Sequence, residues 1–265
     1  MSHLTPICEF DSQKQKVGLY KHPLLGRVLI LNGEINHIEN YQHLYHEPLV
    51  HIPAAFIEDP KNCLILGGGS LFAAFEVLKY PSIEKIVLCD YDHTVIDLMI
   101  KNYDHAKKVQ SDKRFQYIEE EAVSFVKNHT NKYDLIIYDC FNFAEMDNGL
   151  DMYEDLYRLC SGNGVCSDVI YRHIFEKKCL SNSLGQLRLQ RNLALSLIVI
   201  PEYPGVLHIL SIWGKNRNIF QEQQTNFNKY HKNLADISQF KMFMPNHLPY
   251  YLYLPPYIKE IISDS

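Results

Sequence analysis

The chain has 265 residues, of which 46% are hydrophobic and 22% are charged, and its formal net charge is -5. This length and composition indicate a folded protein that can bury a sizeable core, not a disordered chain. The acidic balance and the lack of a long basic run argue against nucleic acid as a partner, and no apolar run is long enough to span a membrane.

The seven cysteines are scattered along the chain and form no CxxC pair. An odd number of unpatterned cysteines, in a sequence that shows no signal peptide, is typical of a reducing compartment. We therefore expect a cytoplasmic protein with free thiols.

The first fifty residues have the pattern of short strands. Residues 15–20 alternate loosely, residues 27–31 are rich in β-branched and aliphatic side chains, and Asn32-Gly33 is a strong hairpin signal before a returning strand at 34–39. From 39 to 56 the apolar spacing becomes helical. We expect a small N-terminal β-domain over residues 1–50 and a second domain over 51–265.

From residue 61 onward, apolar strand patterns alternate with helical ones. Strands are predicted at 62–66, 85–90, 115–118, 134–138, 164–169, 195–200 and 207–213, and helices at 71–79, 93–101, 121–129, 151–159 and about 176–190. Such alternation is typical of an α/β fold with a mostly parallel, doubly wound sheet. Ligands of these sheets bind beyond the carboxyl ends of the strands.

The most informative stretch is Cys63-Leu-Ile-Leu-Gly-Gly-Gly-Ser70, which is followed twenty residues later by Cys89-Asp-Tyr-Asp92. A strand that ends in glycines lets the backbone approach a ligand closely, because no Cβ is in the way. An acid at the end of the next strand can accept hydrogen bonds from both hydroxyls of a ribose. This order of turn, helix and acid predicts a nucleoside-binding site.

Acidic residues stand at the expected ends of three of the first four strands of this domain. Asp90 follows the second, residues 119–121 follow the third, and Asp139 follows the fourth. Because the carboxyl ends of parallel strands meet at one edge of a sheet, these acids are expected to lie together with the glycine turn.

These strand ends and their neighbours resemble the spermidine synthase family of polyamine aminopropyltransferases. The matching segments run through nearly the whole chain. They are 15–20, 26–33, 45–47, 76–85, 89–92, 133–139, 201–204 and 247–257. The resemblance implies a Rossmann-like, methyltransferase-type sheet preceded by a small N-terminal β-domain. It also implies transfer of an aminopropyl group from decarboxylated S-adenosylmethionine to a small amine such as putrescine.

The resemblance also implies roles for particular residues. The donor would be held by the glycine turn, by groups around its ribose and by an acid that reads the adenine amino group; these residues are Gln15, Gly67, Gly68, Gly69, Ser70, Asp90 and Glu121. Asp139 would orient and deprotonate the attacking amine, with Tyr45 beside it. His46, Asn142 and Tyr203 would line the acceptor channel.

The chemistry suits these residue types. A protonated alkylamine is not a nucleophile, so transfer from a sulfonium needs a carboxylate that collects a proton and holds the amine in line. The sulfonium is already an activated leaving group, so no metal is expected. An acidic and aromatic channel suits a cationic donor and a cationic acceptor.

The chain departs from the family pattern at two places. Where the family has Gly-Gly-Gly-Asp-Gly-Gly, this chain has Gly67-Gly-Gly-Ser70-Leu71-Phe72, so the acid that pairs with the ammonium group of the donor is missing. A second acid, expected three residues after Asp139, is replaced by Asn142. Losing one charge-assisted contact costs about 1.5–3 kcal/mol, which affects donor selectivity.

Two alternatives therefore stay open beside aminopropyl transfer. Because Ser70 removes the group that repels a carboxylate, the donor could be intact S-adenosylmethionine and the reaction N-methylation. The chain could also be a non-catalytic relative that keeps nucleoside binding. The resemblance further implies a homodimer or a homotetramer.

Overall fold

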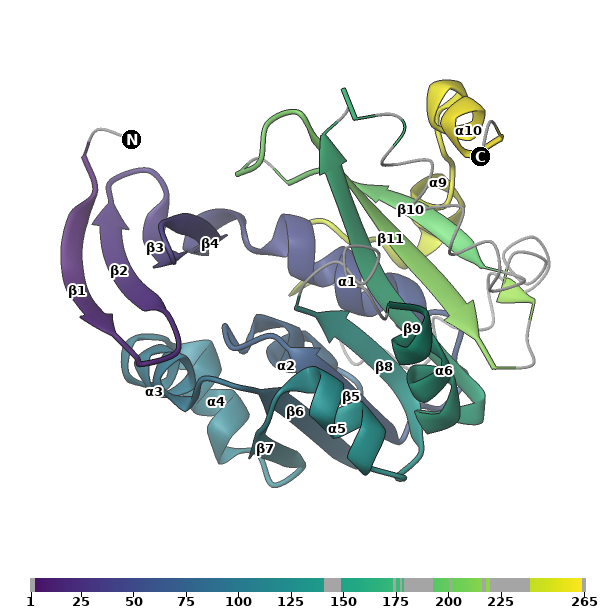
Figure 1. Cartoon of the computed structure of the whole chain (residues 1–265), viewed down its shortest axis with the longest axis horizontal. Coiled ribbons are helices and arrows are strands. Elements are labelled where there is room, and N and C mark those ends of the chain that lie inside the picture. The colour runs from purple at the N-terminus through teal and green to yellow at the C-terminus, as the bar shows by residue number, and fades with distance from the viewer. Residues whose placement is uncertain are drawn as a thin grey trace.

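The computed structural model describes residues 3–140, 149–173, 175, 176, 178, 193–200, 202–215, 218, 219 and 239–263. The predicted site residue Asn142 and most of the helix predicted at about 176–190 lie outside these ranges. In Figure 1 a small sheet at the N-terminus stands beside a larger sheet with helices on both faces. None of the helices within the described ranges combines the length and the apolar character needed to cross a membrane.

The N-terminal sheet has four antiparallel strands in sequential order. They are β1 (Thr5–Asp11), β2 (Lys16–His22), β3 (Gly26–Leu31) and β4 (Glu34–Ile38). Asn32 and Gly33 connect β3 to β4 and both have positive φ, of 52° and 87°. This is the geometry that a two-residue hairpin needs to match the twist of its strands, so the predicted hairpin is confirmed.

A short connection joins this sheet to the rest of the chain. It consists of η1 (Glu39–Tyr41) and α1 (His43–Ala54), where the sequence predicted a helix over 39–56. The domain boundary expected between residues 50 and 51 falls inside α1, and the division into two domains stays a prediction.

The larger sheet has seven strands in the order β10-β11-β9-β8-β5-β6-β7. They are β5 (Asn62–Gly67), β6 (Lys85–Asp90), β7 (Phe115–Glu119), β8 (Tyr133–Asp139), β9 (Cys160–His173), β10 (Ala194–Ile198) and β11 (Val206–Gly214). The chain order reverses between β5 and β8, which creates the switch point where such folds bind ligands. Only β11 runs against the other strands of this sheet, so the expected mostly parallel sheet is confirmed.

The helices are α2 (Phe72–Val77), α3 (His93–Asn102), α4 (Asp104–Ser111), α5 (Ala122–Asn128), α6 (Gly149–Leu159), α9 (Leu248–Tyr251) and α10 (Pro256–Ser263), with a 3-10 turn η5 (Pro245–His247) before α9. Helix α4 was not predicted. Only Tyr103 separates it from α3, and the sequence pattern after α3 was interpreted as a loop.

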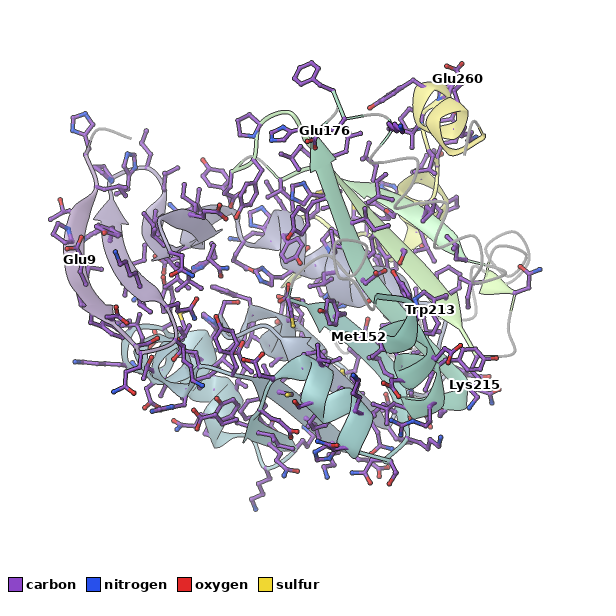
Figure 2. The ribbon with its side chains drawn as sticks, viewed as in Figure 1. Glu9, Met152, Glu176, Trp213, Lys215 and Glu260 are labelled. Atoms are coloured by element: carbon purple, nitrogen blue, oxygen red, sulfur yellow. The ribbon has the colours of Figure 1, made fainter. Side chains whose placement is uncertain are left out.

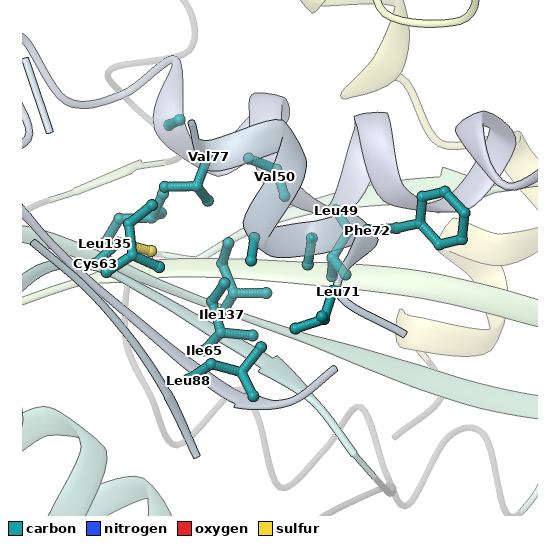
Figure 3. Close-up of a cluster of buried hydrophobic side chains, with 14 of the residues drawn as sticks. Leu49, Val50, Cys63, Ile65, Leu71, Phe72, Val77, Leu88, Leu135 and Ile137 are labelled. Carbon is teal, nitrogen blue, oxygen red and sulfur yellow. The ribbon is translucent and has the colours of Figure 1, made fainter. Parts of the chain in front are cut away.

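Each face of the larger sheet has its own hydrophobic core. On one face, side chains of α1 and α2 pack on alternate residues of β5, β6 and β8, as Figure 3 shows for Leu49, Val77, Ile65, Leu88 and Ile137. On the other face, α5 and α6 cover the intervening residues of the same strands. Strands that are buried on both sides explain the continuous apolar runs in the sequence.

Buried polar contacts fix α1 in place. The Glu47 carboxylate, 2% exposed, accepts hydrogen bonds from the backbone N–H groups of residues 241–243 in the C-terminal segment. His51 Nε2 lies 2.8 Å from Glu76 Oε2 in α2, and His51 Nδ1 lies 2.9 Å from the Tyr80 hydroxyl. Helix α1 is therefore tied both to α2, which follows the glycine turn, and to the end of the chain.

Candidate active site

The carboxyl ends of β5, β6 and β8 bring three predicted site residues to one edge of the larger sheet. In the strand register Gly67 pairs with Asp139, and Leu66 pairs with Cys89, which directly precedes Asp90. The glycine turn and the two acids therefore stand on neighbouring strands, as the sequence predicted.

The glycine turn needs glycine for two physical reasons. Gly67 and Gly68 have φ values of +79° and +75°, which side chains with a Cβ rarely adopt. A Cβ at Gly67 would also overlap the Asp139 carbonyl oxygen, and one at Gly68 would lie 3.3 Å from Asp139 Oδ2. The turn thus keeps open the space beside the Asp139 carboxylate. Leu71, with φ +62°, is the N-cap residue directly before α2.

Asp139 and Tyr45 form the central pair of the site. The Tyr45 hydroxyl donates a hydrogen bond of 2.6 Å to Asp139 Oδ1, which joins α1 to the end of β8. Burial raises the pKa of Asp139 to about 7, although the Tyr45 hydrogen bond opposes this shift. Burial also raises the pKa of the Tyr45 phenol well above its ordinary value. A carboxyl group with a pKa near neutrality can take up a proton from a reacting group.

Asp90 is the second half-buried acid at this edge. Burial raises its pKa to about 6, and the backbone N–H of Asp92 donates to its Oδ1 at 3.0 Å. A Cβ on Gly69 would lie 3.0 Å from Asp90 Oδ2, so the turn and the acid are in close contact. Asp90 can therefore accept hydrogen bonds from a ligand that lies over the turn.

Gln15 reaches this edge from the N-terminal sheet, but its contact is with Asp92. Its Nε2 donates to Asp92 Oδ2 at 2.9 Å, and the Ser12 hydroxyl donates to the same oxygen at 2.6 Å. Asp92 also caps α3 by accepting from the Thr94 N–H. Sequence reasoning gave no role to Asp92, which connects the two sheets next to Asp90.

Glu121 lies at the same edge but is exposed. It is the residue before α5 and makes no side-chain cap on that helix. Its charge contributes to the raised pKa of Asp90, which places it near that acid.

Histidines surround the position at which the family's acid is replaced. The Ser70 hydroxyl lies 3.5 Å from His46 Nε2, and the Ser70 carbonyl oxygen lies 3.0 Å from His105 Nε2. Burial lowers the pKa of both histidines to about 4, so both rings are neutral at pH 7. Phe72 stacks on His105 with ring centroids 3.6 Å apart. His105 was missed because α4, which carries it, was not predicted.

Tyr203 lies between the two sheets. Its hydroxyl donates a hydrogen bond to the Ile35 carbonyl oxygen of β4. It is also close enough to Tyr45 to contribute to the raised pKa of that phenol. The edge of the larger sheet thus holds a glycine turn, two half-buried acids, and tyrosine and histidine side chains.

Comparisons with known proteins identify relatives of this chain. The family model described as "Spermine/spermidine synthase domain" matches residues 42–224. Polyamine aminopropyltransferase 1 of Aquifex aeolicus is 31% identical over 211 residues, which cover 77% of this chain and 74% of the relative. Putrescine N-methyltransferase 2 of Nicotiana attenuata is 40% identical over 129 residues, which cover 48% of this chain and 35% of the relative.

A solved structure shares the fold over almost the whole chain. The crystal structure of spermidine synthase from Thermotoga maritima matches with a TM-score of 0.82 and 23% sequence identity, and the match covers 98% of this chain and 89% of that one. At this identity the likeness concerns the fold, which includes both the N-terminal sheet and the larger sheet.

Proposed function

This chain belongs to the spermine/spermidine synthase family, and from that premise we propose that it is a transferase that moves an aminopropyl group from decarboxylated S-adenosylmethionine to a small amine such as putrescine. The observation that carries this proposal is the hydrogen bond between Tyr45 and Asp139, placed at the carboxyl edge of the sheet beside the glycine turn. The Aquifex relative, named for polyamine aminopropyl transfer, supports it.

The donor lies over the glycine turn in this proposal. Asp90 accepts hydrogen bonds from the ribose hydroxyls, and Gln15, held by Asp92, closes that side of the site. Gly67, Gly68 and Gly69 let the backbone approach the nucleoside, with Ser70 at its tail. Glu121, near Asp90, reads the adenine amino group.

The reaction is a nucleophilic displacement at carbon. The amine nitrogen attacks the carbon next to the sulfonium, a C–N bond forms, and the C–S bond breaks with its electron pair going to sulfur, which releases methylthioadenosine. The attacking nitrogen loses one proton, and Asp139 takes it. The Tyr45 hydroxyl holds the Asp139 carboxylate in one orientation, so the base needs little rearrangement when the amine arrives.

The acceptor enters along α1 and the loop before β11. His46 and Tyr203 line this side in our proposal; Asn142, which the sequence predicts to share this role, lies outside the described residues. The aromatic surface favours an amine that carries a positive charge at its far end.

A second function is favoured by one specific observation. The polar partners of Ser70 are the neutral histidines His46 and His105. Among the described residues, no carboxylate is hydrogen-bonded to Ser70, so none at this position would repel the carboxylate of intact S-adenosylmethionine. The Nicotiana relative is named as a putrescine N-methyltransferase. N-methylation of the same amine is therefore the alternative, with the same base.

One experiment separates these functions. The purified protein is titrated calorimetrically with S-adenosylmethionine, its decarboxylated form and methylthioadenosine, and the products formed with putrescine are identified by mass spectrometry. Aminopropyl transfer predicts preference for the decarboxylated donor and spermidine as the product. N-methylputrescine formed from the intact donor would replace the first proposal by the second, and failure of all three ligands to bind would contradict both.

We also propose a homodimer or homotetramer in the cytoplasm, with no membrane or nucleic acid partner. The six described cysteines are all free thiols, which supports a reducing compartment. Light scattering during size-exclusion chromatography measures the oligomeric state.

A further inference from the structure

His208 in β11 lies on the same face of the larger sheet as Asp139, the proposed base. It pairs with Tyr171 of β9, and the next inward pair of the register, Leu210 and Val169, belongs to the core that α1 covers. Side chains alternate along strands and paired residues share a face, so His208 and Tyr171 also face the α1 side. Tyr45 reaches Asp139 from that side.

The register also places His208 at the ligand-binding edge. Ile137 of β8 pairs with Ser167 of β9, so Asp139 is level with Val169, and Tyr171 lies two residues further out. Because β9 separates β8 from β11, these two strands are about 10 Å apart across the sheet, and the two-residue offset along the strands brings the separation of the Asp139 and His208 backbones to about 12 Å. In Figure 2, Glu176 lies just beyond the carboxyl end of β9, which is at the ligand-binding edge. Lys215 lies just beyond the carboxyl end of β11, which is at the opposite edge of the sheet.

Two tyrosine rings enclose the His208 imidazole. Its centroid lies 6.0 Å from that of Tyr171 and 5.6 Å from that of Tyr203. Tyr203 is held by its hydrogen bond to Ile35, and it also neighbours Tyr45. The Tyr45–Asp139 pair and the Tyr203–His208 pair therefore lie on the same side of the sheet.

The His208 ring presents a hydrogen-bond acceptor that nothing in the described residues satisfies. The side chain is 5% exposed, and its Nδ1 is buried with no partner among those residues. Burial lowers the pKa of His208 to about 4, so the ring is neutral at pH 7 and one of its two nitrogens carries a lone pair. With the ring proton on Nε2, that lone pair is on the unpartnered Nδ1. A buried acceptor without a donor is costly, which points to a ligand that donates there.

A second unsatisfied acceptor lies in the same region. Glu202 precedes Tyr203, and its Oε2 is buried without a hydrogen-bond partner within the described residues. Burial raises the pKa of Glu202, and its charge contributes to the raised pKa of Tyr203. An acceptor between aromatic rings suits an ammonium group, which brings only donors and a positive charge.

We propose that His208 Nδ1 accepts a hydrogen bond from the second amino group of a diamine whose first amino group lies at Asp139, so that His208 selects diamines over monoamines. This inference rests on the proposed function, because it requires that Asp139 receives the attacking amine. What it adds is a specificity-determining residue that sequence analysis did not single out.

The test compares putrescine with n-butylamine, which has the same carbon chain but no second amino group. Both are assayed with whichever donor supports turnover, in the wild type and in His208→Phe, which keeps a ring but removes both nitrogens. We expect kcat/KM for putrescine to fall about tenfold or more and kcat/KM for n-butylamine to stay within about twofold.

Two further variants keep the result interpretable. His208→Gln retains a carbonyl acceptor and should recover part of the preference for putrescine, whereas His247→Phe makes the same exchange at an exposed position and should leave both amines unaffected. Equal losses for both amines, or no loss, in a folded His208→Phe protein would overturn the role of His208 while leaving the proposed function intact. A wild type that transfers to neither amine would overturn the proposed function and this inference together.

Discussion

The Tyr45 hydroxyl and the Asp139 carboxylate are 94 residues apart in the chain and 2.6 Å apart in the fold. The hydrogen bond joins a helix that follows the N-terminal sheet to the end of a central strand. The hydrogen bond orients the carboxyl group, and burial raises the pKa of that group to about 7.

Replacing Asp139 by Asn should abolish turnover without abolishing donor binding. Asparagine keeps the shape and can still accept from Tyr45, but it cannot take a proton from the amine. A general base accelerates the reaction about 10²–10⁴-fold, so we expect kcat to fall by a factor in that range. Mass-spectrometric rates and calorimetric affinity for methylthioadenosine measure the two effects. Persisting turnover would show that another group is the base.

The pH dependence of the reaction should follow the ionisation of Asp139. Only the carboxylate form is a base, and burial raises the pKa of Asp139 to about 7, so kcat/KM should rise with pH through a limb near 7. The Tyr45 hydrogen bond favours the ionised form. Tyr45→Phe should therefore raise the pKa of Asp139 and move this limb to higher pH. If the limb keeps its position in Tyr45→Phe, the group that titrates in it is not Asp139.

Introducing an acid at Ser70 should change the donor preference. In Ser70→Asp a carboxylate would meet the ammonium of the decarboxylated donor and repel the carboxylate of intact S-adenosylmethionine. A charge-assisted hydrogen bond contributes about 1.5–3 kcal/mol, so the ratio of the two affinities should shift at least tenfold. Ser70→Asn is the neutral control of the same shape. If both variants shift the ratio equally, charge is not the cause.

A methyl group added at Gly68 should disturb both the turn and the base. Gly68→Ala combines a φ of +75° with a Cβ that would lie 3.1 Å from Ile65 Cγ2 and 3.3 Å from Asp139 Oδ2. We expect a loss of about 1–3 kcal/mol in the free energy of unfolding and a fall in kcat. Gly33→Ala has a similar φ of +87° with nothing within 4 Å, so it isolates the backbone cost. Urea unfolding and steady-state rates compare the two.

Neutralising Glu47 should loosen the C-terminal segment. Its carboxylate accepts from three consecutive backbone N–H groups, whereas the glutamine of Glu47→Gln offers one acceptor oxygen and an NH₂ group that cannot accept. The expected cost is about 1–3 kcal/mol of unfolding free energy, with faster proteolysis after residue 239. Glu9→Gln, on the exposed strand β1 in Figure 2, is the control and should change little.

The sequence predicted what local patterns encode. Apolar runs that end in glycine or an acid located β5, β6 and β8, and Asn32-Gly33 located the hairpin. Those signals are local because a buried parallel strand needs a continuous apolar run and a tight hairpin needs particular residues. The meeting of Gly67 and Asp139 then followed from the fold class.

The rest depended on contacts between distant segments. Helix α4 was missed because it follows α3 after one residue, and with it the contact of His105 with Ser70. The sequence predicted that the Gln15 amide lies near the ribose. It did not predict the hydrogen bond from Gln15 to Asp92, because that contact depends on how the N-terminal sheet packs against α3. His208 lies in an apolar strand, where a lone histidine gives no signal until its neighbours are known.

The anchoring of Glu47 also has a consequence for the order in which the protein is made. The amides that satisfy this carboxylate come 194 to 196 residues later in the chain. While the ribosome is still producing the intervening strands, α1 carries a carboxylate whose backbone partners do not yet exist. We therefore expect the helix that bears Tyr45 to reach its full stability only after residues 241–243 have left the ribosomal tunnel.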